Sequence, residues 1–237
     1  MDSHSLVIGL VAEGVTDLDF LQLSIEQTLR DHGFEGALSF RHIQPELDAT
    51  SGKHGDGSWS RVHQWCIAHP PDARRLSIFQ PLFAGRAPLD ALVVHLDGDV
   101  LDEYKPHVKV ALPKKPWTPA KRADFVEAAL NEWLWPGAQE RDENHILAVM
   151  VRALESWLLA AYDRNLLAPE DMDPEPALRT ASPHLNPPQT PGARLRKKPN
   201  KWEKMSQDAL PHLAHIRNVC PSSERFFSQV EALPLEK

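Results

Sequence analysis

Short apolar runs recur along this chain and alternate with longer segments of helical periodicity. Residues 6–12, 91–96 and 145–151 are rich in Val, Ile and Leu, which is typical of strands buried on both faces of a parallel sheet. Residues 37–43 form a weaker fourth run. With helical segments between and after these runs, the order is β-α-β-α-β-α-β-α. This order predicts an α/β fold whose parallel strands are joined by right-handed crossovers.

The helical segments have recognisable ends. Thr16 is the expected N-cap of the first helix and Gly33 its stop. Residues 58–69 are expected to form a second helix that ends at Pro70. Residues 120–135 follow Thr118 and Pro119, an expected N-cap and first helical position. A fourth helix is expected over residues 153–162.

Residues 166–237 differ in character from the rest of the chain. Prolines are frequent over residues 171–199 and periodicity is weak there, so this stretch is expected to be irregular. Short helices are expected around residues 201–205, 208–217 and 222–233. The chain therefore divides into an α/β domain, residues 1–165, and a Pro-rich and helical C-terminal extension, residues 166–237, packed on it.

Composition narrows the classes of function. The chain has 237 residues and a net charge of -7, which argues against a protein that coats DNA through bulk positive charge. The two cysteines have neither metal-ligand spacing nor a disulfide framework, so a reduced, cytoplasmic setting is expected. No apolar run approaches the ~20 residues that span a membrane, and we expect no membrane association. A homo-oligomer is compatible with the sequence.

Acidic residues follow two of the predicted strands. Glu13 and Asp17 come after the first strand, and Asp97 and Asp99 flank a glycine after the strand at residues 91–96. The carboxyl ends of parallel strands meet at one edge of a sheet, where working groups of α/β proteins lie. Clustered carboxylates repel one another unless a cation neutralises them, and oxygen ligands suit Mg²⁺ or Mn²⁺. The pattern predicts a metal-dependent phosphoryl-transfer site.

Each of these acids also has a plain structural interpretation. Glu13 alone is typical of an exposed turn, and Asp17 of a first-turn acid favoured by the helix dipole. Asp-Gly is a common turn dipeptide. Asp102 and Glu103 are best interpreted as surface charge. The metal-site hypothesis depends on the acids acting together.

The motif Glu13-Gly14-x-Thr16-Asp17, combined with Asp97-x-Asp99, resembles the topoisomerase-primase (TOPRIM) fold. Its first part is similar to the branch found in the OLD (overcoming lysogenization defect) nucleases. Residues 152–160, RALESWLLA, and residues 220–227, CPSSERFF, resemble the small bacterial RloB-like TOPRIM proteins. The resemblance implies a TOPRIM-like, Rossmann-like parallel sheet flanked by helices, with a helical C-terminal extension.

The resemblance also implies roles for individual residues. Glu13 would be the general base or hold the catalytic metal, Asp97 and Asp99 would be metal ligands, and Asp17 would support the first metal. Glu155, one turn into the helix after the last strand, would be a further ligand. The competing interpretation of Glu155 is a surface acid paired with Arg152.

Basic residues that could bind nucleic-acid phosphates lie in three segments. The densest runs from residue 194 to residue 202 and includes a tryptophan that could stack on a base. For each residue the alternative is a solvated loop. The predicted nucleic-acid-binding residues are Lys53, Lys114, Lys115, Arg194, Arg196, Lys197, Lys198 and Lys201.

These observations lead to one leading hypothesis and two alternatives. The leading one is a Mg²⁺-dependent or Mn²⁺-dependent nuclease acting on DNA or RNA as a bacterial anti-phage effector. The resemblance adds an ATPase partner protein. The first alternative is a non-catalytic TOPRIM-like module that binds nucleic acid or a partner protein. The second is phosphoryl chemistry on a small nucleotide, for which a narrow closed pocket would be expected.

Overall fold

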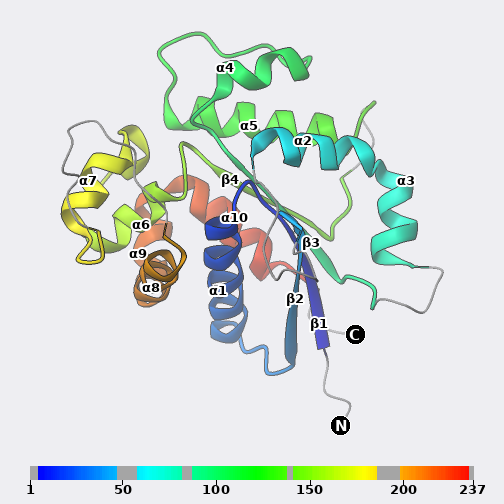
Figure 1. Cartoon of the computed structure of the whole chain (residues 1–237), viewed down its shortest axis with the longest axis horizontal. Coiled ribbons are helices and arrows are strands. Elements are labelled where there is room, and N and C mark those ends of the chain that lie inside the picture. The colour runs from blue at the N-terminus through cyan, green and yellow to red at the C-terminus, as the bar shows by residue number, and fades with distance from the viewer. Residues whose placement is uncertain (1–4, 47–57, 82–86, 138–140, 186–197, 235–237) are drawn as a thin grey trace.

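The computed structural model describes residues 5–46, 58–81, 87–137, 141–185 and 198–234. Four parallel strands form one sheet in the order β2-β1-β3-β4 (Figure 1). The strands are β1 (Ser5–Val11), β2 (Ala37–Gln44), β3 (Ala91–Asp97) and β4 (His145–Met150). The predicted parallel α/β fold is confirmed. β3 and β4 are buried along their whole length, as expected of strands covered on both faces.

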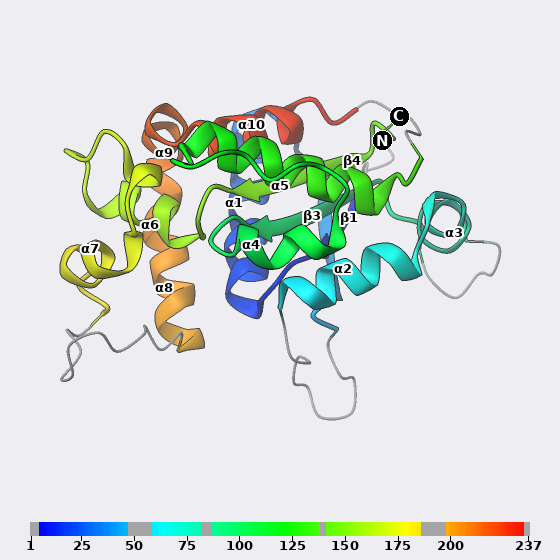
Figure 2. The same ribbon diagram turned by 90° about the horizontal axis from the view of Figure 1, so that it is seen from above.

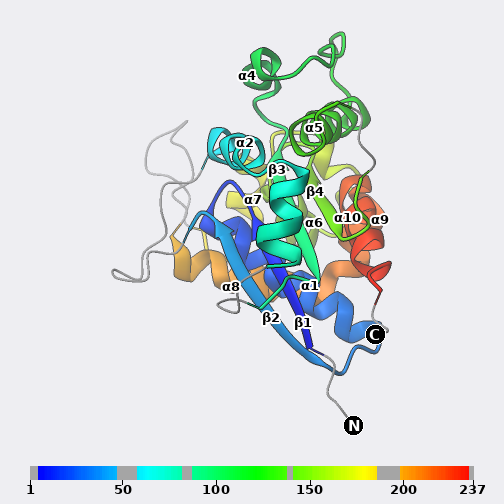
Figure 3. The ribbon, with the colours of Figure 1, turned by 90° about the vertical axis from the view of Figure 1, so that its right-hand side faces the viewer.

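Helices cover both faces of the sheet. The longer ones are α1 (Val15–Asp31), α2 (Trp59–Ala68), α5 (Pro119–Leu134), α6 (Glu155–Tyr162), α7 (Pro174–Ala181), α8 (Pro199–Ala209), α9 (Leu213–Val219) and α10 (Pro221–Glu231). Two four-residue helices are α3 (Pro71–Arg74) and α4 (Leu101–Tyr104). Figure 3 shows α2, α4 and α5 on one side of the sheet and α1, α8 and α10 on the other.

Two hydrophobic clusters correspond to these two faces. Even-numbered residues of β1, such as Ile8 and Leu10, pack with α1, α6 and the C-terminal helices. Leu92, Val94 and Leu96 of β3 face the other way, toward α2, α4 and α5. This alternation follows from the two-residue period of a strand. The C-terminal helices therefore complete one face of the sheet, and the division of the chain at residue 165 stays a prediction.

Some expected element ends were wrong. Gly14, not Thr16, is the N-cap of α1; the Thr16 hydroxyl instead lies 3.5 Å from Asp17 Oδ1. Thr118 does cap α5, accepting from the Lys121 N–H. Residues 174–181, expected to be irregular, form α7, because its prolines occupy the first turn, where no backbone N–H donor is needed.

The C-terminal residues 199–231 form one compact set of helices rather than loosely attached pieces. Trp202 of α8 and Phe226 and Phe227 of α10 are fully buried. Figure 2 shows α8, α9 and α10 running along the side of the molecule that carries α1 and α6. No helix in the described ranges is long and apolar enough to cross a membrane.

Candidate active site at the carboxyl edge of the sheet

The predicted acids meet at the carboxyl ends of β1 and β3. Glu13 Oε1 accepts a hydrogen bond of 2.7 Å from the Asp97 N–H, although the two residues are 84 positions apart in the chain. Asp17 projects from the first turn of α1 and is buried. Asp99 follows Gly98 and is exposed to solvent. We call Glu13, Asp17, Asp97 and Asp99 the acidic edge.

His95 is a member of this site that the sequence analysis missed. It is fully buried in β3, and its Nε2 lies 3.2 Å from Asp97 Oδ1. Burial acts to lower the pKa of His95, but the hydrogen bond and charge of Asp97, with Asp17 and Glu13, raise that pKa to about 9. An imidazolium at neutral pH therefore supplies positive charge among the carboxylates. The available signal was a polar residue two positions before Asp97, on the same face of an apolar strand.

The surroundings of Glu13 disfavour its ionised form. Burial raises its pKa well above the usual value, and the negative charges of Asp97 and Asp17 raise it further. His95 and the hydrogen bond from the Asp97 N–H act in the opposite direction. A carboxylate with a raised pKa is a stronger base, which is the property of a general base that works near neutral pH. It also gains most from a nearby cation.

The turn after β3 is fixed by its neighbours. Tyr104 of α4 donates its hydroxyl to the Asp97 carbonyl, and Gly98 donates its N–H to the Arg152 carbonyl at 2.9 Å. A Cβ at position 98 would lie 2.4 Å from the Val151 carbonyl oxygen. The absence of a side chain at Gly98 therefore admits the backbone that follows β4.

Glu155 is the first residue of α6 and is buried. It follows β4, the neighbour of β3 in the sheet, so it belongs to the same carboxyl edge one strand further along. Because Glu155 is buried, the alternative interpretation of it as a surface acid paired with Arg152 does not fit the structure. Its role as a metal ligand stays a prediction.

The predicted basic residues fall on separate elements. Lys114 is exposed, and the Lys115 ammonium lies 3.9 Å from Asp102 and 4.6 Å from the centre of the Trp117 ring. Lys198 and Lys201 lie at the start of α8. The remaining predicted residues, Lys53, Arg194, Arg196 and Lys197, lie outside the described residues.

The donors at the acidic edge are of the right chemistry for Mg²⁺, which proteins commonly bind through one or two carboxylates completed by water and substrate phosphates. Among the described residues, no group of three or more His, Cys, Asp or Glu side chains is placed to hold a metal ion. Since Glu13 is turned toward a backbone N–H and Asp97 toward His95, a cation here would rely on few protein ligands.

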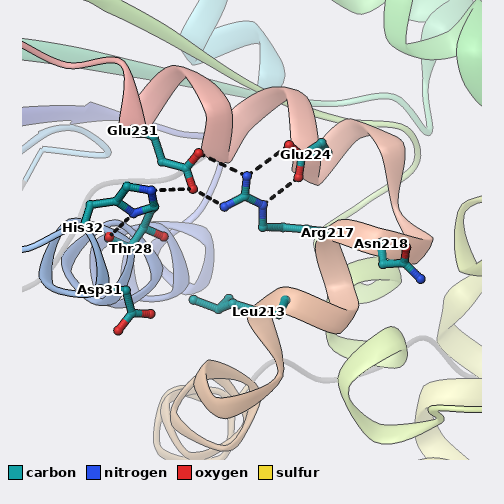
Figure 4. A pocket seen from close by; sticks show the side chains of 9 residues that line it. Thr28, Asp31, His32, Leu213, Arg217, Asn218, Glu224 and Glu231 are labelled. Atoms are coloured by element: carbon teal, nitrogen blue, oxygen red, sulfur yellow. Dashed lines mark hydrogen bonds and ion pairs between the residues drawn. The ribbon is translucent and has the colours of Figure 1, made fainter.

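A separate cavity of about 550 Å³ lies beside the other end of α1 (Figure 4). Its acidic side chains are occupied by protein contacts: the Arg217 guanidinium donates to both Glu224 and Glu231, and His32 lies 3.5 Å from Glu231. The rise of a helix puts Thr28 of the cavity roughly 16 Å from Asp17 along α1. This cavity therefore is not the closed pocket at the acidic edge that a small-nucleotide enzyme would require.

The chain was compared with protein-family models, curated proteins and solved structures, and it matches none of them. A four-stranded parallel sheet is shared by many unrelated α/β proteins, so the fold alone does not assign a function. The resemblance to TOPRIM proteins accordingly rests on the motif residues and stays a prediction.

Proposed function

We propose that this protein is a divalent-metal-dependent nuclease that hydrolyses phosphodiester bonds of DNA or RNA at the acidic edge. The observation that carries the proposal is the contact between Glu13 and Asp97, which joins the ends of two different strands. This contact joins the Glu13 carboxylate to the Asp97 backbone N–H and so places residue 97 beside Glu13. Carboxylate oxygens are the ligands that Mg²⁺ and Mn²⁺ prefer. Bacterial defence and an ATPase partner belong to the same proposal and rest on the TOPRIM-like motifs.

The residues would divide the work as follows. Glu13, whose pKa burial raises, accepts a proton from the attacking water. Asp97 and Asp99 would hold the cation, and Asp17 and Glu155 are the further oxygen donors on the same edge of the sheet. His95 fixes the orientation of Asp97 from inside the sheet. A divalent cation bound there would supply Lewis-acid stabilisation of the charge that develops on the phosphoryl oxygens.

The first test is Mn²⁺ binding by calorimetry. We expect the parent to bind Mn²⁺ and the Asp97→Asn/Asp99→Asn double variant to lose that binding. Asp72→Asn is the matched control, because Asp72 is an exposed acid of α3, away from the acidic edge.

In a screen of single-stranded and double-stranded DNA and RNA, Glu13→Gln should lower cleavage about 10²- to 10⁴-fold. Cleavage by Glu13→Gln at the parental rate would refute the assignment of the base.

A non-catalytic module that binds nucleic acid or a partner protein is the second candidate. Two observations favour it: the described residues contain no group of three or more metal-binding side chains, and His95 already gives Asp97 a positive neighbour. This candidate predicts no Mn²⁺ binding either by the parent alone or with an oligonucleotide present. Mn²⁺ binding that depends on Asp97 and Asp99 would contradict it.

A further inference from the structure

Two arginines flank the turn between Asp97 and Asp99. Arg122, in the first turn of α5, donates from Nη1 to the Gly98 carbonyl at 2.7 Å. Arg152, just after β4, accepts the Gly98 N–H with its own carbonyl at 2.9 Å. One residue of α5 and one of the β4–α6 connection are thus hydrogen-bonded to the same glycine, which lies between Asp97 and Asp99 of the acidic edge.

The Arg122 side chain and the Arg152 backbone both contact Gly98, so the two arginines are near neighbours. Burial lowers the pKa of Arg122, the positive charge of Arg152 lowers it further, and Asp99 and Asp102 oppose both effects. Like charges brought together in a fold are unfavourable unless an anion lies near them. Asp99, the exposed member of the acidic edge, supplies only part of that compensation.

Both guanidinium groups also have unused donors. An arginine has five N–H donors, and to the described residues each of these two makes one side-chain hydrogen bond, Arg122 to Gly98 and Arg152 to the Asp171 carbonyl at 3.5 Å. The Nε of each is buried and has no hydrogen-bond acceptor among the described residues. Buried donors without acceptors are costly, and such groups are usually satisfied by an ion or by water.

Arg122 is held in place before any ligand arrives. Its guanidinium carbon lies 5.0 Å from the centre of the Trp117 ring, which is also in contact with the Lys115 ammonium at 4.6 Å. Cation–π contacts of this kind fix the plane of a guanidinium. A preorganised side chain loses less entropy when it binds an anion.

We propose that Arg122 and Arg152 together form a phosphate-binding site next to the acidic edge. Paired, planar guanidinium groups match the tetrahedral oxygens of a phosphate and bind it through several parallel hydrogen bonds. Assignment of this phosphate to a nucleic acid rests on the proposed function. In that setting the pair positions the phosphodiester against Glu13, Asp97 and Asp99.

The test follows the arginine Nε–H signals by NMR during titration with inorganic phosphate, without divalent metal and at constant ionic strength. We expect two of these signals to shift. The signal that is missing from the Arg122→Lys spectrum belongs to Arg122, and the signal that is missing from the Arg152→Lys spectrum belongs to Arg152. Lysine keeps a donor for the Gly98 carbonyl at position 122 and for the Asp171 carbonyl at position 152, but it lacks the fork. Each variant should therefore fold and bind phosphate roughly ten- to a hundredfold more weakly. The control is Arg225→Lys, which changes an exposed arginine paired with Asp124; it should bind phosphate like the parent.

Phosphate binding that is unchanged in both lysine variants would overturn the site, and so would equal shifts of all arginine signals. The Asp97→Asn/Asp99→Asn variant separates this proposal from the proposed metal site. If the variant retains cleavage, the assignment of the cation to Asp97 and Asp99 fails, whereas the phosphate site is judged on the arginine signals alone. If a short single strand binds through the same arginines more tightly than inorganic phosphate does, the phosphate that the site recognises belongs to a polymer. A mononucleotide that binds as tightly as the strand identifies a free nucleotide.

Discussion

Two histidines of this protein are buried in the sheet, in surroundings of different charge. His95 is a fully buried residue of β3 that lies against Asp97. His145 begins β4 and is almost as deeply buried, but its surroundings are of the opposite charge. The same side chain is thus stabilised as a cation at the carboxyl edge of the sheet and as a neutral ring at the amino edge.

The environment of His145 determines which nitrogen carries its proton. Arg74 donates from Nε to His145 Nε2 at 3.2 Å, so Nε2 is the acceptor and the proton lies on Nδ1, 3.6 Å from Asp142. Burial, with the positive charges of Arg74 and Arg141, lowers the pKa of His145 to about 3. The unfolded chain takes up a proton here below about pH 6.5, whereas the folded protein does so only near pH 3.

This difference predicts an acid-sensitive contribution to stability. A lowered folded-state pKa contributes stability that is present above about pH 6.5 and is lost as the pH falls toward 3, by about 1.4 kcal/mol per pH unit. His145→Gln keeps an acceptor for Arg74 but does not titrate. Urea unfolding should therefore show the parent losing roughly 3 kcal/mol relative to the variant between pH 7 and pH 4. A constant difference between the two proteins over that range would contradict the prediction.

Edge strands need their outward backbone groups satisfied, and at Leu147 of β4 a single side chain does this. Gln229 of α10 accepts the Leu147 N–H at 3.1 Å and donates to the Leu147 carbonyl at 3.3 Å. Its amide thereby takes the place of a fifth strand at this position. Arg141 also donates to the Gln229 carbonyl oxygen and holds it there.

Loss of the Gln229 amide should weaken the sheet at β4. We expect Gln229→Ala to lower the free energy of unfolding by about 1–3 kcal/mol, because a backbone donor and acceptor lose their partners. Gln229→Glu keeps the acceptor and should cost less. Urea unfolding gives the free energies, and hydrogen exchange at the Leu147 amide gives the local effect. Equal exchange rates at Leu147 in the parent and in Gln229→Ala would rule out this role.

The sequence contained enough information for the strands and for the meeting of Glu13 with Asp97, because apolar runs fix strands and parallel order places their ends together. It did not reveal α7, whose helical pattern is brief and rich in proline. The sequence also did not reveal that Arg122 and Arg152 lie near each other. Their approach depends on how the chain after β4 packs against Gly98, and no local pattern encodes that contact.

At the scale of the whole molecule, the two hydrophobic clusters come from different parts of the chain. Apart from Val11 of β1, the buried residues of the α2, α4 and α5 face come from residues 62–151, whereas the other face joins residues from β1 to residues of α8, α9 and α10. Trp157 of α6 contacts Phe226 and Phe227, with ring centres 5.8 and 5.9 Å apart. The N-terminal and C-terminal parts therefore share one core.

A fragment of residues 1–165 should accordingly fail to fold. Without α8 and α10 it would expose Phe20, Trp157 and much of the α1 face of the sheet, which are buried in the full chain. Burial of such large side chains is worth several kcal/mol each, comparable with the total stability of a domain. Circular dichroism and dye binding should show a molten or unfolded fragment beside a folded full chain. A cooperatively unfolding fragment would instead support an independent domain that ends at residue 165.

The shared core also has a consequence for synthesis on the ribosome. Glu13 and Asp97 leave the ribosome early, but α8 and α10, which complete the cover on their side of the sheet, follow only with residues 199–231. At typical translation speeds of about 5–20 residues per second, the 81 residues from the end of β4 to the end of α10 take about 4–16 s to make. During that interval a nascent chain carries an uncovered apolar face. That face is fully covered only once α10 has been made.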